Sequence, residues 1–78
     1  MITQILLPKL GFSMEEGTLT EWLAADGAPV VQGQPLYLLE SEKSVEEISA
    51  PASGVLKIII PPGNRLVVGT VLGEIHRE

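Results

Sequence analysis

Short apolar runs alternate with turn-forming residues along the whole chain. The runs cover residues 2–7, 17–24, 29–31, 36–40, 44–50, 55–60, 65–68 and 71–75. Glycine, proline, asparagine or aspartate separates most of them, and these residues interrupt helices and close the turns between strands. Branched aliphatic side chains, which favour pleated sheets, dominate the runs. The pattern predicts an all-β fold.

The stretch 36–50 is the longest that lacks glycine and proline, so it is the best place to look for a helix. A helix there would be interrupted by the polar segment 40–44, and its apolar residues would form no continuous stripe. Two strands joined by a polar turn fit the stretch better. We therefore expect a hairpin with Glu42 and Lys43 in its turn.

An internal repeat relates the two halves of the chain. Gly17, Leu19, Gly27, Val31, Gly33 and Leu36 correspond to Gly54, Leu56, Gly63, Val67, Gly69 and Leu72, at an offset of 37 that becomes 36 after one deletion. Half-domains this short cannot each bury a core, so we expect them to interlock about a pseudo-twofold axis as two sheets packed face to face. The repeated leucines should be buried, with Lys43 at one end of the molecule and the termini at the other.

Composition and charge narrow the possible functions. The 78 residues suit one domain, spanning 1–78 with a core of about 3–76, and they include no cysteine and a single histidine, so disulfides and a zinc site are not expected. The net charge of −5 argues against nucleic acid and anionic membrane surfaces. No apolar run approaches the roughly 20 residues of a membrane span, and no signal peptide is evident. We expect a cytoplasmic, monomeric domain, or one of the mitochondrial matrix in a eukaryote.

Several segments together resemble a known family. They are Leu7-Pro8-Lys9-Leu10-Gly11, Met14-Glu15-Glu16-Gly17, Val31-Gln32-Gly33-Gln34-Pro35-Leu36, Glu40-Ser41-Glu42-Lys43-Ser44 and Ala50-Pro51-Ala52-Ser53-Gly54-Val55-Leu56. At this spacing they are similar to the lipoyl domain of dihydrolipoamide acyltransferase, a component of 2-oxo acid dehydrogenase complexes, over about residues 5–75. The chain departs from the usual pattern in having Glu42 and Ser44 beside Lys43 and a glutamate at position 46.

The resemblance implies a flattened barrel-sandwich hybrid of two four-stranded antiparallel sheets. It also implies that Lys43 is amide-linked to lipoic acid and carries acyl groups and electrons between active sites. A lipoate ligase or lipoyl transferase would attach the group. The partners would be the 2-oxo acid (or acetoin) dehydrogenase, the acyltransferase core and dihydrolipoamide dehydrogenase. The family's acyltransferase motif is absent, so we expect a carrier and not an enzyme.

Residues near Lys43 are candidates for recognition by the ligase or a partner. Glu40, Glu42 and Ser44 flank it, and in the family the loop holding Phe12 and Met14 lies beside the lysine-bearing turn; a simpler role for these two side chains is to pack beneath that loop. We expect Trp22 to be half-buried in a strand, Lys57 to point outward, and His76 to be exposed in a frayed end.

Two alternatives remain open. A biotin carboxyl carrier domain has the same fold, but that family usually has methionine on both sides of its lysine. An unmodified, lipoyl-like structural module would need no lysine in the turn.

Overall fold

The structure is a computed structural model that describes residues 1–9, 14–41 and 44–77. Within these ranges it contains strands and turns but no helix, and hence no helix that could cross a membrane. The strands are β1 (Ile2–Leu6), β2 (Glu16–Trp22), β3 (Pro29–Val30), β4 (Pro35–Glu40), β5 (Val45–Ser49), β6 (Gly54–Ile58), β7 (Asn64–Val67) and β8 (Val71–His76). The all-β prediction is confirmed, with strand ends close to those expected.

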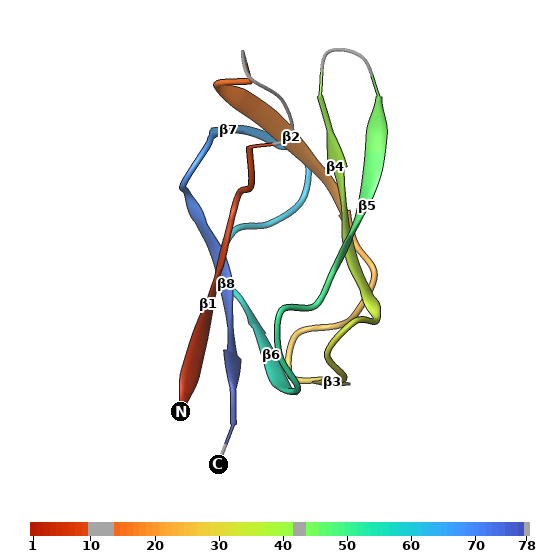
Figure 1. Ribbon diagram of the computed structural model, residues 1–78, viewed down its shortest axis with the longest axis vertical. Helices are drawn as coiled ribbons and strands as arrows, with labels where there is room; N and C mark the ends of the chain where they lie inside the picture. Colours follow the sequence, from red (N-terminus) through yellow and green to blue (C-terminus); the bar gives the residue numbers. More distant parts are fainter. Residues whose placement is uncertain (10–13, 42–43, 78) are drawn as a thin grey trace.

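The strands form two antiparallel sheets of four strands each (Figure 1). The first has the order β1-β8-β6-β3 and the second the order β5-β4-β2-β7. Exchanging β1 with β5, β8 with β4, β6 with β2 and β3 with β7 converts one order into the other. The sheets are therefore related as the internal repeat predicts, and the expected sandwich with pseudo-twofold symmetry is confirmed.

The repeat also extends to backbone conformation in the turns. Gly27 and its counterpart Gly63 have φ angles of 85° and 96°, and Gly33 and its counterpart Gly69 have angles of 92° and 94°. A side chain on any of these residues would be strained, because this left-handed region favours glycine. The repeated glycines therefore mark turns that both halves make in the same way.

The core lies between the two sheets and is aliphatic. The repeated leucines Leu19, Leu36, Leu56 and Leu72 are fully buried there, as expected. Tyr37 is also buried, and its ring lies 5.4 Å from that of the half-buried Trp22, centroid to centroid. The Trp22 indole N–H donates to the Ile60 carbonyl over 3.0 Å, so this polar group is satisfied within the packed interior.

The two ends of the elongated molecule, which measures 37 × 20 × 19 Å, are closed in the same way. At one end the Met1 ammonium donates to the Arg77 carbonyl over 2.6 Å, and the Arg77 amide donates to the Met1 carbonyl over 2.8 Å. At the other end the Ser41 amide donates to the Ser44 carbonyl, also over 2.8 Å. The termini and the end of the β4–β5 hairpin thus lie at opposite ends, as expected (Figure 1).

One expectation is wrong. His76 is not in a frayed end: it is the last residue of β8, where it is paired with Ile2 of β1 and Val55 of β6. Its Nε2 lies 2.9 Å from Oε1 of Glu74. Pairing on both sides holds the backbone here, which sequence position alone did not reveal. Lys57 is exposed on β6, as predicted.

Candidate functional site

The β4–β5 hairpin forms the candidate site. The pairing of its two strands shows how many residues connect them. Glu40 pairs with Val45, and beyond this pair the Ser41 amide donates to the Ser44 carbonyl over 2.8 Å. The Ser41 hydroxyl donates to the same carbonyl over 3.2 Å. In the sequence only two residues, Glu42 and Lys43, separate Ser41 from Ser44. Glu42, Lys43 and Phe12 lie outside the described residues, so the predictions about them stay predictions.

The hairpin extends past the core. Leu39 is the last fully buried residue of β4, and Glu40 after it is exposed. β5 is an edge strand, and all its side chains are exposed except Ile48, which is half-buried and packs against the core. The core therefore holds the base of the hairpin, and the described residues Glu40, Ser44 and Val45 beyond it are exposed.

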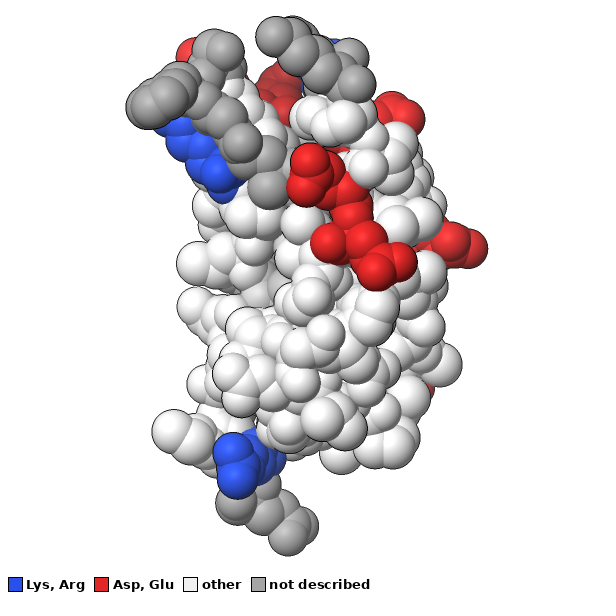
Figure 2. Space-filling model, turned by 45° about the vertical axis from the view of Figure 1, so that its right-hand side comes forward, with Lys and Arg blue, Asp and Glu red and all other residues white. Residues whose placement is uncertain are grey.

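Exposed acidic side chains follow the hairpin. Glu40 and Glu47 lie on the outer face of their sheet, whereas Glu46 pairs with Leu39 and shares the inner face with it, exposed at the sheet edge. The described residues of β4 and β5 include no basic side chain. Figure 2 shows acidic side chains gathered over this side of the molecule. The described part of the hairpin therefore carries three exposed carboxylates.

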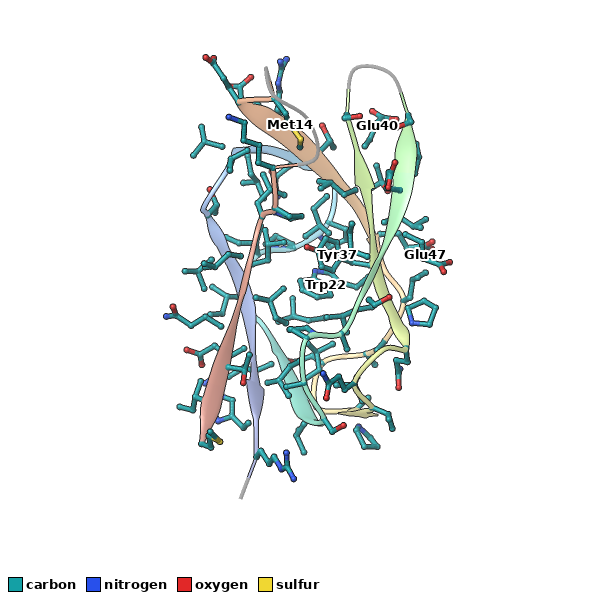
Figure 3. The ribbon with its side chains drawn as sticks, in the orientation of Figure 1. Met14, Trp22, Tyr37, Glu40 and Glu47 are labelled. Carbon is teal, nitrogen blue, oxygen red and sulfur yellow. The ribbon has the colours of Figure 1, made fainter. Side chains whose placement is uncertain are left out.

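Met14 lies at the same end of the molecule as Glu40 (Figure 3). Its side chain is half-buried and packs against the core. A Cβ atom on Gly17 of β2 would lie 2.8 Å from Met14 Cε, 2.9 Å from Leu39 Cδ1 and 3.4 Å from the Glu40 carbonyl oxygen. Met14 therefore packs onto Gly17 beside the end of β4, and Figure 3 shows it across from Glu40.

Gly17 is the residue near the site whose role the sequence analysis missed. The sequence marks it as a repeat position related to Gly54 and as part of a segment that resembles the family, but not as a point of close approach. A Cβ atom on Gly54 would meet Ile75 and His76, the counterparts of Leu39 and Glu40. Both glycines thus lie against the last residues of a neighbouring strand, and the repeat was the signal that could have identified the close approach.

We also searched the described part of the chain for a metal site or a pocket. It contains no group of three or more histidine, cysteine or acidic residues placed to hold a metal ion. A shallow hollow of about 430 Å³ lies among Met1, Ile2, Val55, His76 and Arg77, at the end opposite the hairpin. The hairpin therefore remains the best candidate site.

Known proteins match this chain over nearly its full length. The family model described as "Biotin-requiring enzyme" matches residues 3–75. The succinyltransferase component of the 2-oxoglutarate dehydrogenase complex of Rickettsia felis is 36% identical over 77 residues, which are 97% of this chain and 19% of that protein. The acetyltransferase component of the acetoin cleaving system of Cupriavidus necator is 36% identical over 73 residues, which are 92% of this chain and 20% of that protein. The chain spans about a fifth of the length of these curated relatives.

Solved structures agree on the fold. The lipoyl domain of the 2-oxoglutarate dehydrogenase complex of Azotobacter vinelandii superposes with a TM-score of 0.78, at 28% identity and with 95% of both chains covered. A multi-domain long-chain acyl-CoA carboxylase superposes with a TM-score of 0.77 at 23% identity, over 99% of this chain and 7% of that one, and supports the fold alone. The chain belongs to the Biotin_lipoyl family of carrier domains, and within that family it is a domain of the lipoyl type.

Proposed function

We propose that Lys43 carries lipoic acid in amide linkage, and that the domain moves acyl groups and electrons between the active sites of a 2-oxo acid or acetoin dehydrogenase complex. The observation that carries the proposal is the closure of the hairpin at Ser41 and Ser44, because it leaves Glu42 and Lys43 as the whole connection. The relatives named above, acyltransferase components of 2-oxoglutarate and acetoin systems, support the class of complex.

The residues around the connection fit a covalently attached arm. A lysine amine can form the amide. Of the nearest described residues on either side, Ser41 is half-buried and Ser44 is exposed. Glu40 and Val45, the next pair, are both exposed, so these described residues do not enclose the connection. The bound group would supply a dithiolane on an arm of about 14 Å, a reach that follows from standard bond lengths.

The chain's own part in this function is presentation. The core holds the base of the hairpin, and covalent attachment would keep the bound group near its partners at high local concentration. The domain itself catalyses no step, and the acyltransferase centre lies outside residues 1–78. The partners are the dehydrogenase, the acyltransferase core and dihydrolipoamide dehydrogenase, in the cytoplasm or the mitochondrial matrix. The acidic residues Glu40, Glu46 and Glu47 suit a basic surface on such a partner or on the ligase.

The test is the intact mass of the domain after co-expression with a lipoate ligase, followed by peptide mapping. We expect one lipoyl group, on Lys43. The variant Lys43→Arg should remain folded but unmodified, because exposed substitutions change the free energy of unfolding by less than about 0.5 kcal/mol. The matched variants Lys9→Arg and Lys57→Arg should be modified as in the wild type.

Three results would overturn the proposal: a lipoyl group on Lys9 or Lys57, a biotinyl group after co-expression with a biotin ligase only, or no adduct with either ligase. The second result would indicate a biotin carrier, and the third an unmodified structural module. The purified lipoylated domain, offered to pyruvate, 2-oxoglutarate and acetoin dehydrogenases in turn, would then identify the substrate class by the acyl group it accepts.

A further inference from the structure

The internal symmetry is broken at one place near the hairpin. Leu7-Pro8 and Ala50-Pro51 occupy equivalent positions, since Leu7 accepts from the Gly69 amide and Ala50 from the Gly33 amide, each over 3.0 Å. The next equivalent residues are Gly17 and Gly54. Residues 8–16 join Leu7 to Gly17, whereas residues 51–53 join Ala50 to Gly54. The symmetric fold therefore forms without the extra residues, and Met14 belongs to this insertion.

Met14 packs beside the end of β4, next to the residues that close the hairpin. Its terminal methyl lies over Gly17, and it shares the space above this glycine with the side chain of Leu39: a Cβ atom on Gly17 would lie 2.8 Å from Met14 Cε and 2.9 Å from Leu39 Cδ1. The Ser41 amide, which closes the hairpin onto Ser44, is the next backbone donor along the chain. Met14 and the last two residues of β4 thus surround the same point above Gly17 of β2, and the exposed edge strand β5 lies on the other side of β4.

We propose that Met14 is a positioning residue for modification: packed on Gly17, it holds the end of β4 and thereby keeps the closing pair of Ser41 and Ser44 in place. This inference rests on the proposed function, because the group being positioned is Lys43. A tight contact is needed, since a displacement of about 1 Å at a reacting group can lower a rate a hundredfold. Gly17 is part of the same device, because a side chain there would occupy the space of the methyl.

The first arm of the experiment compares Met14→Ala, Met14→Leu and Gly17→Ala with the wild type, using the initial rate of lipoylation by a lipoate ligase. We expect Met14→Ala to lower the rate about tenfold or more, and Met14→Leu to restore most of it by refilling the contact. Gly17→Ala should also lower it, because Leu39 is locked in the core and Met14 must move instead. The control Ile58→Ala removes another half-buried side chain that packs on the core, and should lower stability but not the rate.

The second arm uses amide hydrogen exchange, with the symmetry of the fold as an internal control. The Ser41 amide should exchange about tenfold faster in Met14→Ala. The Arg77 amide, its counterpart at the opposite end, should exchange as in the wild type, because it bonds to the Met1 carbonyl far from Met14. A general loss of stability would accelerate both amides, whereas a local loss of support accelerates only the first.

The outcomes separate this inference from the proposed function. If the wild type is not lipoylated on Lys43, the proposed function fails. If the wild type is lipoylated, and Met14→Ala is lipoylated at the same rate with unchanged Ser41 exchange, the role of Met14 is overturned. Equal acceleration at Ser41 and Arg77, with a rate loss matched by Ile58→Ala, would overturn it too, because Met14 would then only add stability.

Discussion

At the scale of the residue, Tyr37 shows how burial changes a titration. Its side chain is buried in the interior beside Trp22 (Figure 3), and burial raises the pKa of its hydroxyl from the ordinary value of 10.0 to about 12. The unfolded chain therefore releases this proton at lower pH than the folded protein does. The contribution of Tyr37 to stability is complete below pH 10 and is lost as the pH rises through 12.

The first prediction follows from that shift. Between pH 10 and pH 12 the free energy of unfolding should fall by up to about 1.4 kcal/mol per pH unit on account of Tyr37. Tyr37→Phe should flatten this dependence, because it removes the buried hydroxyl. Urea unfolding at pH 8, 10 and 11 measures it. Parallel slopes for the wild type and the variant would show that the hydroxyl is not responsible.

A second prediction concerns the repeated leucines. Leu36→Ala and Leu72→Ala should each lower the free energy of unfolding by roughly 2–5 kcal/mol, because both side chains are fully buried and each substitution leaves a cavity. Symmetry further predicts similar losses for the two variants. Leu6→Ala, on the exposed face of β1, is the control and should cost about 0.5 kcal/mol. Chemical denaturation compares all three, and a large loss for Leu6→Ala alone would contradict the symmetry argument.

At the scale of the element, the hairpin combines a buried base with an open end. Residues of β4 up to Leu39 are held by the core, and the pairing continues past it to Ser41 and Ser44. Both hydrogen bonds at this closing pair use the Ser44 carbonyl and not its hydroxyl. The backbone, and not the side chain of Ser44, is therefore what fixes the closure.

The third prediction tests this closure. One residue inserted between Glu42 and Lys43 should block lipoylation, because a longer connection changes the turn and redirects the lysine. Ser44→Ala should be lipoylated normally, since it keeps the carbonyl. Adduct mass after co-expression with the ligase distinguishes the variants. Efficient modification of the insertion variant would mean that the ligase tolerates other turn geometries.

Sequence patterns identified most elements because turns and strands here are local. Glycines such as Gly27 and Gly63 announce their turns by residue type, and the apolar runs between turns have the length of strands. The packing of Met14 and Leu39 over Gly17 could not be predicted, because it depends on how β2 and β4 lie against each other. The same holds for His76, whose pairing on both sides comes from β1 and β6.

At the scale of the whole molecule, the pseudo-twofold axis relates the two sheets to each other, but the two ends of the molecule differ. One end carries the insertion with Met14 and the exposed Glu40, and Glu47 lies farther along the same sheet (Figure 3). The other end carries the chain termini and the shallow hollow beside His76. The symmetric core supplies stability to both ends, and each end breaks the symmetry with features of its own.

The pairing of Met1 with Arg77 has a consequence for the entropy of the unfolded chain. Because the folded state already holds these residues together, a peptide link through Glu78 and one added residue would repeat the spacing found between Ser41 and Ser44. Closing the chain would restrict only the unfolded ensemble, and the chain-entropy model gives a gain of roughly 4 kcal/mol for a ring of this size. Urea unfolding of the cyclised and linear proteins measures the gain. An unchanged midpoint would mean that the ends already stay close in the unfolded chain.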